Sequence, residues 1–313
     1  MECSDNINTK IKDILSTMTT FGSVSIETSP PSVVIKTMKA KQAQIMSVIQ
    51  PPSVMSINDI KLTLHNTFDI PKGMSSIGIA GCIVCSNGKM ILVDFYYNRR
   101  LVILNDDGTL YKEILRSQGV PFDVAYLNDR TVAVSIDNGI EIINIDTKNS
   151  ERRTNTSQCC YGITYHNGVL LWCEENSGIQ MKLSDGRITT LVKQTNLPPH
   201  SYIATCREKI YQTDRNTNTV TCYTIKGDKL WEFKDESVLK DPRGVTVDND
   251  GNAYVTSCGS NSVVVLEPDG RQARQILSSK DGLKEPTGIY FDKSKNSLIV
   301  ANYRGPCLLY QKC

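Results

Sequence analysis

At 313 residues with 40% hydrophobic content, the chain is long enough to bury a large core within one domain. A formal charge of +2 provides no global field that would favour nucleic acid or an anionic membrane. No apolar run reaches the roughly eighteen residues of a membrane span, and the first residues lack the basic-then-apolar pattern of a signal peptide, so we expect a cytoplasmic protein.

The first predicted element is a short helix within residues 1–22. Ile7, Ile11, Ile14 and Met18 recur at the a and d positions of two heptads, and Gly22 is suited to end the helix. Because two heptads are marginally stable alone, this helix is either the end of a longer coiled coil, which would make the protein an oligomer, or a helix docked on a surface. Residues 23–57 contain two Pro-Pro pairs and predict a linker.

A repeat of about forty residues fills positions 58–313. Its clearest copy, residues 242–270, has short apolar strands separated by Asn-Asp-Gly-Asn and Pro-Asp-Gly turns. Each copy places side chains on one strand face at one and three residues after an anchor position, and these anchors are Cys82, Asp123, Gly162, Tyr202, Gly244 and Gly288. This period predicts an all-β fold, a six-bladed β-propeller with four-stranded antiparallel blades.

The last copy of the repeat is too short to supply four strands. The chain after Gly288 has room for three, whereas a strand at residues 59–65 belongs to no complete copy. In that strand Ile60, Leu62 and Leu64 alternate on one face. We therefore predict that strand 59–65 completes the sixth blade and closes the ring, because this pairing covers an exposed strand edge.

Residue types that carry metal or nucleophilic chemistry form no site motif. The chain has eleven cysteines, but its one C-x-x-C pair, Cys82 and Cys85, falls in a strand, where residues three apart point to opposite faces. The loop at 248–252 has the alternating carboxylates of a calcium site but lacks its later Glu and flanking helices, which favours a hairpin turn. The three histidines are dispersed, at His65, His166 and His200. We expect reduced structural cysteines, no metal, no cofactor and no enzymatic activity.

One rim of the ring collects the residue types best suited to binding. An Asp/Ser-x-x-x-Asn pattern, as at residues 94–98, recurs in the turns between the second and third strands, where the polar side chains satisfy backbone donors. The variable neighbours of these turns lie on the same side as the residues that precede the anchors. Aromatic and Arg side chains make the strongest binding anchors. The predicted partner-binding rim comprises Tyr96, Tyr97, Arg99, Phe122, Tyr161, Arg215, Arg243, Tyr303 and Arg304.

The motif P-x-G-V-x-V-D-x-x-G-N at residues 242–252, echoed by P-x-G-I-x-F-D at 286–292, resembles the NHL repeat. Residues 58–313 are similar to the six-bladed NHL propeller that ends many tripartite-motif proteins, although Asp123 and Tyr202 replace the anchor glycine. In that family a RING finger recruits a ubiquitin-conjugating enzyme, B-box zinc domains follow, and the propeller selects partners. Since this chain has no such cysteine and histidine array, the resemblance implies ligase activity for relatives or for a longer parent chain.

Three functions from different classes remain open. The favoured one is a non-catalytic interaction propeller that recruits protein partners, as the substrate-recognition part of a ubiquitin-ligase-related protein. RNA binding, which is known for some relatives, would need a basic rim, and Glu174 and Glu175 count against it. A propeller hydrolase or lactonase would need acidic and amide ligands around a central metal.

Overall fold

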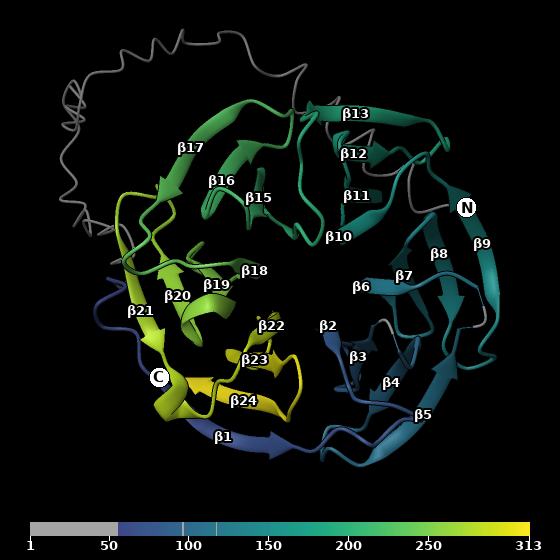
Figure 1. Ribbon diagram of the computed structural model, residues 1–313, viewed down its shortest axis with the longest axis horizontal. Coiled ribbons are helices and arrows are strands. Elements are labelled where there is room, and N and C mark those ends of the chain that lie inside the picture. The colour runs from purple at the N-terminus through teal and green to yellow at the C-terminus, as the bar shows by residue number, and fades with distance from the viewer. Residues whose placement is uncertain (1–55, 96, 117) are drawn as a thin grey trace, which may run out of the picture. The chain divides into compact units, whose positions relative to one another are not determined.

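The computed structural model describes residues 56–95, 97–116 and 118–313. The described residues all lie in one compact unit, residues 52–313. Six four-stranded antiparallel sheets surround a central axis in this unit (Figure 1), which confirms the predicted all-β, six-bladed propeller. The predicted helix at 1–22 and nearly all of the predicted linker lie outside the described residues.

The first three blades follow one another along the chain, and in each blade the first strand is innermost. Blade 1 contains β2 (Ile79–Val84), β3 (Met90–Asp94), β4 (Arg100–Leu104) and β5 (Leu110–Leu115). Blade 2 contains β6 (Pro121–Asn128), β7 (Thr131–Ile136), β8 (Gly139–Asn144) and β9 (Ser150–Asn155). Blade 3 contains β10 (Cys160–His166), β11 (Val169–Glu174), β12 (Gly178–Lys182) and β13 (Ile188–Lys193).

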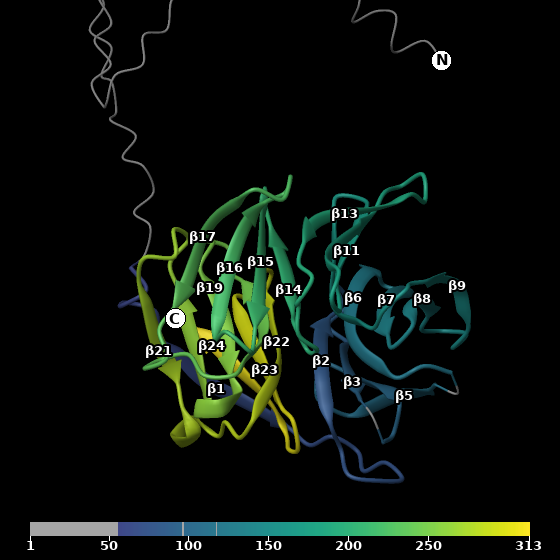
Figure 2. The ribbon, with the colours of Figure 1, turned by 45° about the horizontal axis from the view of Figure 1, so that its top comes forward.

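The other three blades complete the ring. Blade 4 contains β14 (Ile203–Cys206), β15 (Lys209–Asp214), β16 (Thr219–Thr224) and β17 (Lys229–Lys234), which lie side by side in Figure 2. Blade 5 contains β18 (Pro242–Val247), β19 (Ala253–Ser257), β20 (Ser262–Leu266) and β21 (Ala273–Leu277). Blade 6 contains β22 (Pro286–Asp292), β23 (Ser297–Asn302), β24 (Cys307–Lys312) and β1 (Leu62–Phe68).

The fourth strand of blade 6 comes from the other end of the described chain. β1 pairs antiparallel with β24, from Leu62 opposite Lys312 to Phe68 opposite Cys307. The strand spans residues 62–68 rather than 59–65. Leu62 packs partly buried against the core as predicted, but Leu64 is 48% exposed, so the prediction for Leu64 is wrong. An outermost strand packs on one side only, and a bulge after Leu64 interrupts the alternation. Ile60 is instead buried ahead of the strand, next to Ile57 of the predicted linker.

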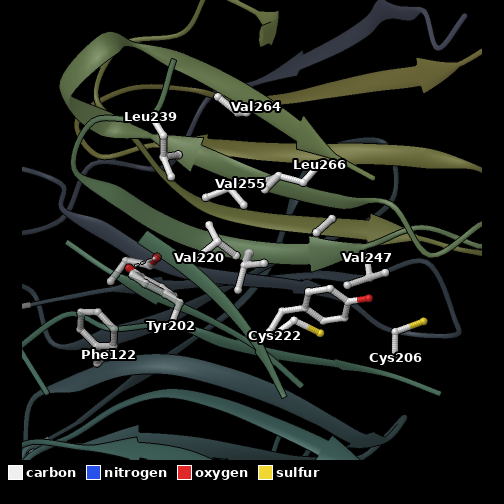
Figure 3. Close-up of a cluster of buried hydrophobic side chains, with 14 residues drawn as sticks. Phe122, Tyr202, Cys206, Val220, Cys222, Leu239, Val247, Val255, Val264 and Leu266 are labelled. Carbon is white, nitrogen blue, oxygen red and sulfur yellow. Dashed lines mark hydrogen bonds between the residues drawn. The ribbon is translucent and has the colours of Figure 1, made fainter. Parts of the chain in front are cut away.

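The hydrophobic core is divided among the interfaces between blades. Between blades 4 and 5, for example, Val220 and Cys222 of β16 face Val255 and Val264 of β19 and β20 (Figure 3). Short hairpins connect the strands, and their tight turns need a left-handed backbone, as at Gly251 with φ 96°. Local turn chemistry therefore builds each blade, whereas burial between neighbouring blades holds the ring together.

The loop at 248–252 is a hairpin turn, as predicted. Oδ1 of Asp248 accepts the backbone N–H groups of Asp250, Gly251 and Asn252, at 3.0, 2.9 and 2.8 Å. Its Oδ2 accepts from Lys312 Nζ at 2.8 Å, so both carboxylate oxygens already have protein partners. None of the ten cysteines in the described part of the chain forms a disulfide. Across residues 56–95, 97–116 and 118–313, no helix has the length and apolar character needed to cross a membrane.

Candidate functional site

The two ends of the ring carry different connections. We call the end where the inner strands begin the entry face, and the end where they finish the exit face. Because the strands of a blade alternate in direction, the turns between second and third strands also lie on the entry face. The predicted rim residues lie in these turns or at the starts of the inner strands, and the entry face therefore carries the candidate site.

Side-chain hydrogen bonds fix the turns of the entry face. Oδ1 of Asp94 accepts the backbone N–H of Gly78 in the link that enters blade 1, at 3.0 Å. Asn218 in the equivalent turn of blade 4 accepts the N–H of Asp241, at 2.8 Å, and thereby ties blade 4 to the link that enters blade 5. The predicted structural role of this pattern is confirmed, and it gives the entry face a rigid frame.

A cluster of rings closes the entry end of the ring axis. Phe122 stacks on His200 with centroids 5.1 Å apart, and it packs against Phe95, Tyr161 and Tyr202 at 5.6, 5.1 and 5.0 Å. Figure 3 shows Phe122 beside Tyr202 at one end of the buried cluster between blades 4 and 5. Only 3% of Phe122 is exposed, so this residue forms the floor of the site rather than projecting from the rim.

A cationic group lies beside the aromatic floor. Nη1 of Arg243 donates to Nδ1 of His200 at 2.8 Å, and its Nη2 donates to Oδ2 of Asp241 at 3.0 Å. Arg215 approaches the same carboxylate, with Nε 3.1 Å from Oδ1. Two guanidinium groups thus share one carboxylate, which leaves a net positive charge at this part of the entry face.

The contact with Arg243 defines the protonation state of His200. A guanidinium only donates, so Nδ1 of His200 accepts and the ring is neutral, with its proton on Nε2. Burial, followed by the charges of Arg243 and Arg215, lowers the pKa of His200 to about 4, and Asp241 offsets part of this effect. His200 therefore holds Arg243 in place and is a weak base near neutral pH.

The opposite side of the floor is acidic. The carboxylate of Glu175 accepts from the Tyr161 hydroxyl at 3.2 Å, and burial, followed by this negative charge, raises the pKa of Tyr161. Glu174 is almost fully buried and accepts from Ser157 Oγ at 2.9 Å and from Trp172 Nε1 at 3.2 Å. The entry face thus has a basic part in blades 4 and 5 and an acidic part in blade 3, with aromatic rings between them.

The remaining predicted rim residues that the structure describes lie in the turns between the second and third strands of blades 1 and 6. Tyr97 is 57% exposed, and Arg99 is exposed in a left-handed turn with φ 47°. Tyr303 packs against the backbone at Gly78, with the Arg304 guanidinium 5.4 Å from its ring centroid. Tyr96 lies outside the described residues.

The structure adds Phe95, His200 and Asp241 to the predicted rim. His200 and Asp241 lie in the links before inner strands, His200 two residues ahead of the anchor Tyr202, so the repeat register contained a signal for them. Phe95 follows a strand that ends in the turn pattern already identified. The sequence did not indicate that these three residues lie close together, because their contacts form only where three different blades meet at the axis.

The axis itself contains a cavity of about 440 Å³, lined by the six inner strands. Its lining reaches the exit face, at residues such as Ser86 and Lys293. Within the described residues, no group of three or more His, Cys, Asp and Glu side chains is arranged to hold a metal ion.

Comparison with known proteins identifies the fold. No family model and no curated protein matches the sequence. Among solved structures, a protein of unknown function from Bacteroides thetaiotaomicron superposes with a TM-score of 0.61 at 13% identity, covering 81% of this chain and 76% of that one. A chain of the nidogen/laminin complex superposes with a TM-score of 0.60 at 20% identity, with 69% and 85% covered.

An enzyme is among the similar structures as well. Virginiamycin B lyase from Staphylococcus aureus superposes with a TM-score of 0.58 at 18% identity, covering 81% of this chain and 99% of the lyase. These neighbours include both an enzyme and a component of a protein complex, so the shared propeller fold is compatible with either class of function.

Proposed function

We propose that this chain is a non-catalytic interaction propeller that recruits a protein partner on its entry face, as the substrate-recognition part of a tripartite-motif, ubiquitin-ligase-like protein. The observation that carries the proposal is the Arg243 guanidinium, held between Asp241 and His200 beside an aromatic floor. The NHL-like motif at 242–252 contains this arginine and supplies the link to the tripartite-motif family.

Rigidity is what makes this arrangement suited to recognition. A free arginine loses rotamer entropy when it binds, but Arg243 is already fixed by two partners and is 12% exposed. Arg215 is held by the same carboxylate and is more accessible, with 34% of its side chain exposed. Arginine and tyrosine dominate binding hot spots because they bury large areas while keeping polar atoms that pair with a partner.

The charge distribution favours a protein over RNA. The basic Arg215 and Arg243 face an acidic part formed by Glu174 and Glu175 across the floor. A phosphate backbone needs a continuous basic track, whereas a folded protein presents both charge signs. The nidogen/laminin complex is an example of a similar propeller fold within a protein assembly.

The chemistry of His200 argues against a hydrolytic site. A general base works best with a pKa near the working pH, but the pKa of His200 is lowered to about 4 and its Nδ1 is occupied by Arg243. The hydroxyl of Tyr202 is likewise engaged with a backbone carbonyl. The polar groups at the floor of the site thus position one another.

The experiment compares two matched triple variants in affinity capture from cell extract. The first replaces Tyr97, Arg215 and Arg304 by alanine on the entry face. The second replaces Tyr111, Arg187 and Arg271 by alanine. These residues are exposed away from the entry face, so the second variant loses the same chemical groups at other positions. We expect the first variant to bind the proteins captured by the native chain at least about tenfold more weakly, a loss of about 1.4 kcal/mol in binding free energy. The second variant should bind them with the native affinity.

Two further arms separate the alternatives. Capture that disappears after nuclease treatment supports RNA as the ligand and contradicts the protein proposal. The ubiquitination role is tested by fusing the native chain behind a RING domain in a reconstituted reaction. A captured protein should then be ubiquitinated with the native propeller and not with the entry-face variant, and equal modification by both would contradict substrate recognition by this face.

A further inference from the structure

The cavity on the ring axis is closed at one end. At the entry end the Tyr202 hydroxyl donates to the backbone carbonyl of Ala80 at 2.9 Å, and Phe122 packs over Tyr202. At the exit end the cavity is lined by exposed parts of Ser86, Tyr165 and Lys293. The cavity is therefore a blind pocket that opens on the exit face, opposite the proposed protein-binding surface.

Asp123 lines the closed end of this pocket. It occupies an anchor position where other copies of the repeat have glycine, as at Gly244 and Gly288. Room for its carboxyl group exists because Gly81 in blade 1 has no side chain, and a Cβ there would collide with Oδ1 of Asp123. Oδ2 accepts the backbone N–H of Ile163 in blade 3, at 3.0 Å.

The carboxyl of Asp123 lacks a cationic neighbour among the described residues. Burial raises its pKa to about 7, and only the backbone N–H groups of Ile163 and Val124 act in the other direction. A buried carboxylate without an opposite charge is costly, and it becomes favourable when a cation enters beside it. The closed end of the pocket therefore has an electrostatic preference for a positively charged group.

The wall between Asp123 and the opening of the pocket carries both apolar and polar side chains. Val84, Ala125 and Ala204 supply apolar surface, and Thr164 and Thr246 add hydroxyl groups. The volume of about 440 Å³ falls in the range of roughly 300–1,000 Å³ that is usual for small-molecule sites. The apolar part of this wall suits an alkyl chain better than a highly charged molecule.

We propose that this pocket binds a primary ammonium group on a short alkyl stem, with the ammonium against Asp123 and the stem along the wall. A divalent metal ion fits less well, because it takes about six or more oxygen ligands and the pocket end offers a single carboxylate. The ammonium belongs either to a free amine or to a lysine side chain that a peptide inserts from the exit face. Both sources present the same chemistry to Asp123.

A purely structural role for Asp123 is the alternative, since its carboxyl bridges blade 2 to blade 3 through Ile163. Asp123→Asn separates the two roles, because asparagine keeps an oxygen acceptor for that N–H and removes only the charge. Asp107→Asn is the matched control, which removes the same charge from an exposed turn on the exit face. Thermal unfolding of both variants checks that the ring is intact.

The probes are n-butylamine, putrescine and an acetylated, amidated lysine tripeptide, titrated by calorimetry at constant potassium chloride. We expect at least one probe to bind the native chain and the Asp107→Asn control equally, and to bind Asp123→Asn at least tenfold more weakly. Affinity should also fall by about tenfold from pH 8 to pH 6, as the carboxyl with a pKa of about 7 becomes protonated.

Each outcome decides one question. Binding of the free amines without the tripeptide assigns the pocket to a small metabolite, and binding of the tripeptide assigns it to a partner's lysine. The proposal is overturned if no probe binds at millimolar concentration, or if Asp123→Asn binds as well as the native chain. Because the pocket opens on the exit face, its ligand and the captured protein approach from opposite faces, and the two proposals are tested separately.

Discussion

The hydroxyl of Tyr202 donates to the backbone carbonyl of Ala80 at 2.9 Å across the axis of the ring, as the dashed line in Figure 3 marks. Tyr202 lies just before the inner strand of blade 4, and Ala80 lies in the inner strand of blade 1. Blades 1 and 4 are on opposite sides of a ring of six, so the bond joins opposite blades. The Tyr202 side chain thus braces the ring across its axis and, with Phe122 packed over it, closes the channel.

Tyr202→Phe tests this brace. The substitution leaves the buried carbonyl of Ala80 without this donor, so we expect a loss of about 1–2 kcal/mol in the free energy of unfolding. Tyr111→Phe, at an exposed position, is the control and should change stability by less than about 0.5 kcal/mol. Urea denaturation measures both, and equal stability of the two variants would contradict a bracing role.

Lys312 and Asp248 form a buried ion pair between blades 6 and 5, with 4% and 0% of their side chains exposed. Lys312→Met leaves the carboxylate buried without its cation and should cost about 3–5 kcal/mol at neutral pH. Adding Asp248→Asn should recover part of that loss, because the uncompensated charge is removed. A Lys312→Met variant as stable as the native chain at pH 7 would refute the assignment.

The same pair predicts a pH dependence. Burial alone would raise the pKa of Asp248, but donors from Lys312 and Asn252 outweigh it, so the folded-state pKa lies below the ordinary value of 3.8. The carboxylate therefore adds stability above that value and loses it as pH falls through the folded-state pKa. The difference in melting temperature between the native chain and Lys312→Met should be largest near neutrality and shrink below about pH 4.

Asp123→Asn should have the opposite pH signature. The pKa of Asp123 is raised to about 7 in the folded state, so the folded protein binds this proton more tightly than the unfolded chain. Its ionisation lowers stability as pH rises from about 4 to about 7. We expect Asp123→Asn to gain roughly 1–3 kcal/mol at pH 8 and nearly nothing at pH 4. A loss of stability at pH 8 would indicate that the charge itself supports the fold.

Deletion of residues 1–68 tests closure of the ring. It removes β1 together with the buried Ile57 and Ile60, and it exposes the edge of β24. An unpaired edge strand promotes association, so we expect aggregation and a lower melting temperature, measured by size-exclusion chromatography and thermal scans. Deletion of residues 1–55 retains these contacts and is the matched control. Identical melting of the two truncated chains would show that β1 is dispensable.

Arg243→Lys tests the recognition geometry of the entry face. The planar guanidinium of Arg243 donates to His200 and Asp241 at the same time, which a lysine ammonium cannot do in the same geometry. The substitution therefore keeps the charge but makes the cation mobile. We expect affinity for the captured partner to fall by about tenfold, or about 1.4 kcal/mol, in a surface-binding measurement. Lys240→Arg, in the same link, is the control and should bind normally. Unaltered binding by Arg243→Lys would mean that charge alone suffices.

Much of the blade architecture was predictable from the sequence. The strands and hairpins of each copy depend on residues a few positions apart, such as the Asp248 carboxylate and the N–H groups of the same turn. Period-2 apolar patterning and turn residues act within that range, so the six copies and their inner faces could be assigned from the sequence. The turn asparagines were predictable for the same reason, since their role is to bond nearby backbone.

The exposure of Leu64 and the side-chain contacts at the axis of the ring could be assigned only from the tertiary structure. Leu64 was expected to be buried and is exposed, because the outermost position of β1 depends on pairing with β24 near the other end of the chain. Phe95, Phe122 and His200 meet only after three blades converge, and the environment of Asp123 is made by backbone from both neighbouring blades. Local patterns set the blades, whereas the aromatic floor, the cationic group and the blind pocket arise from contacts between distant parts of the chain, which appear only when the ring closes.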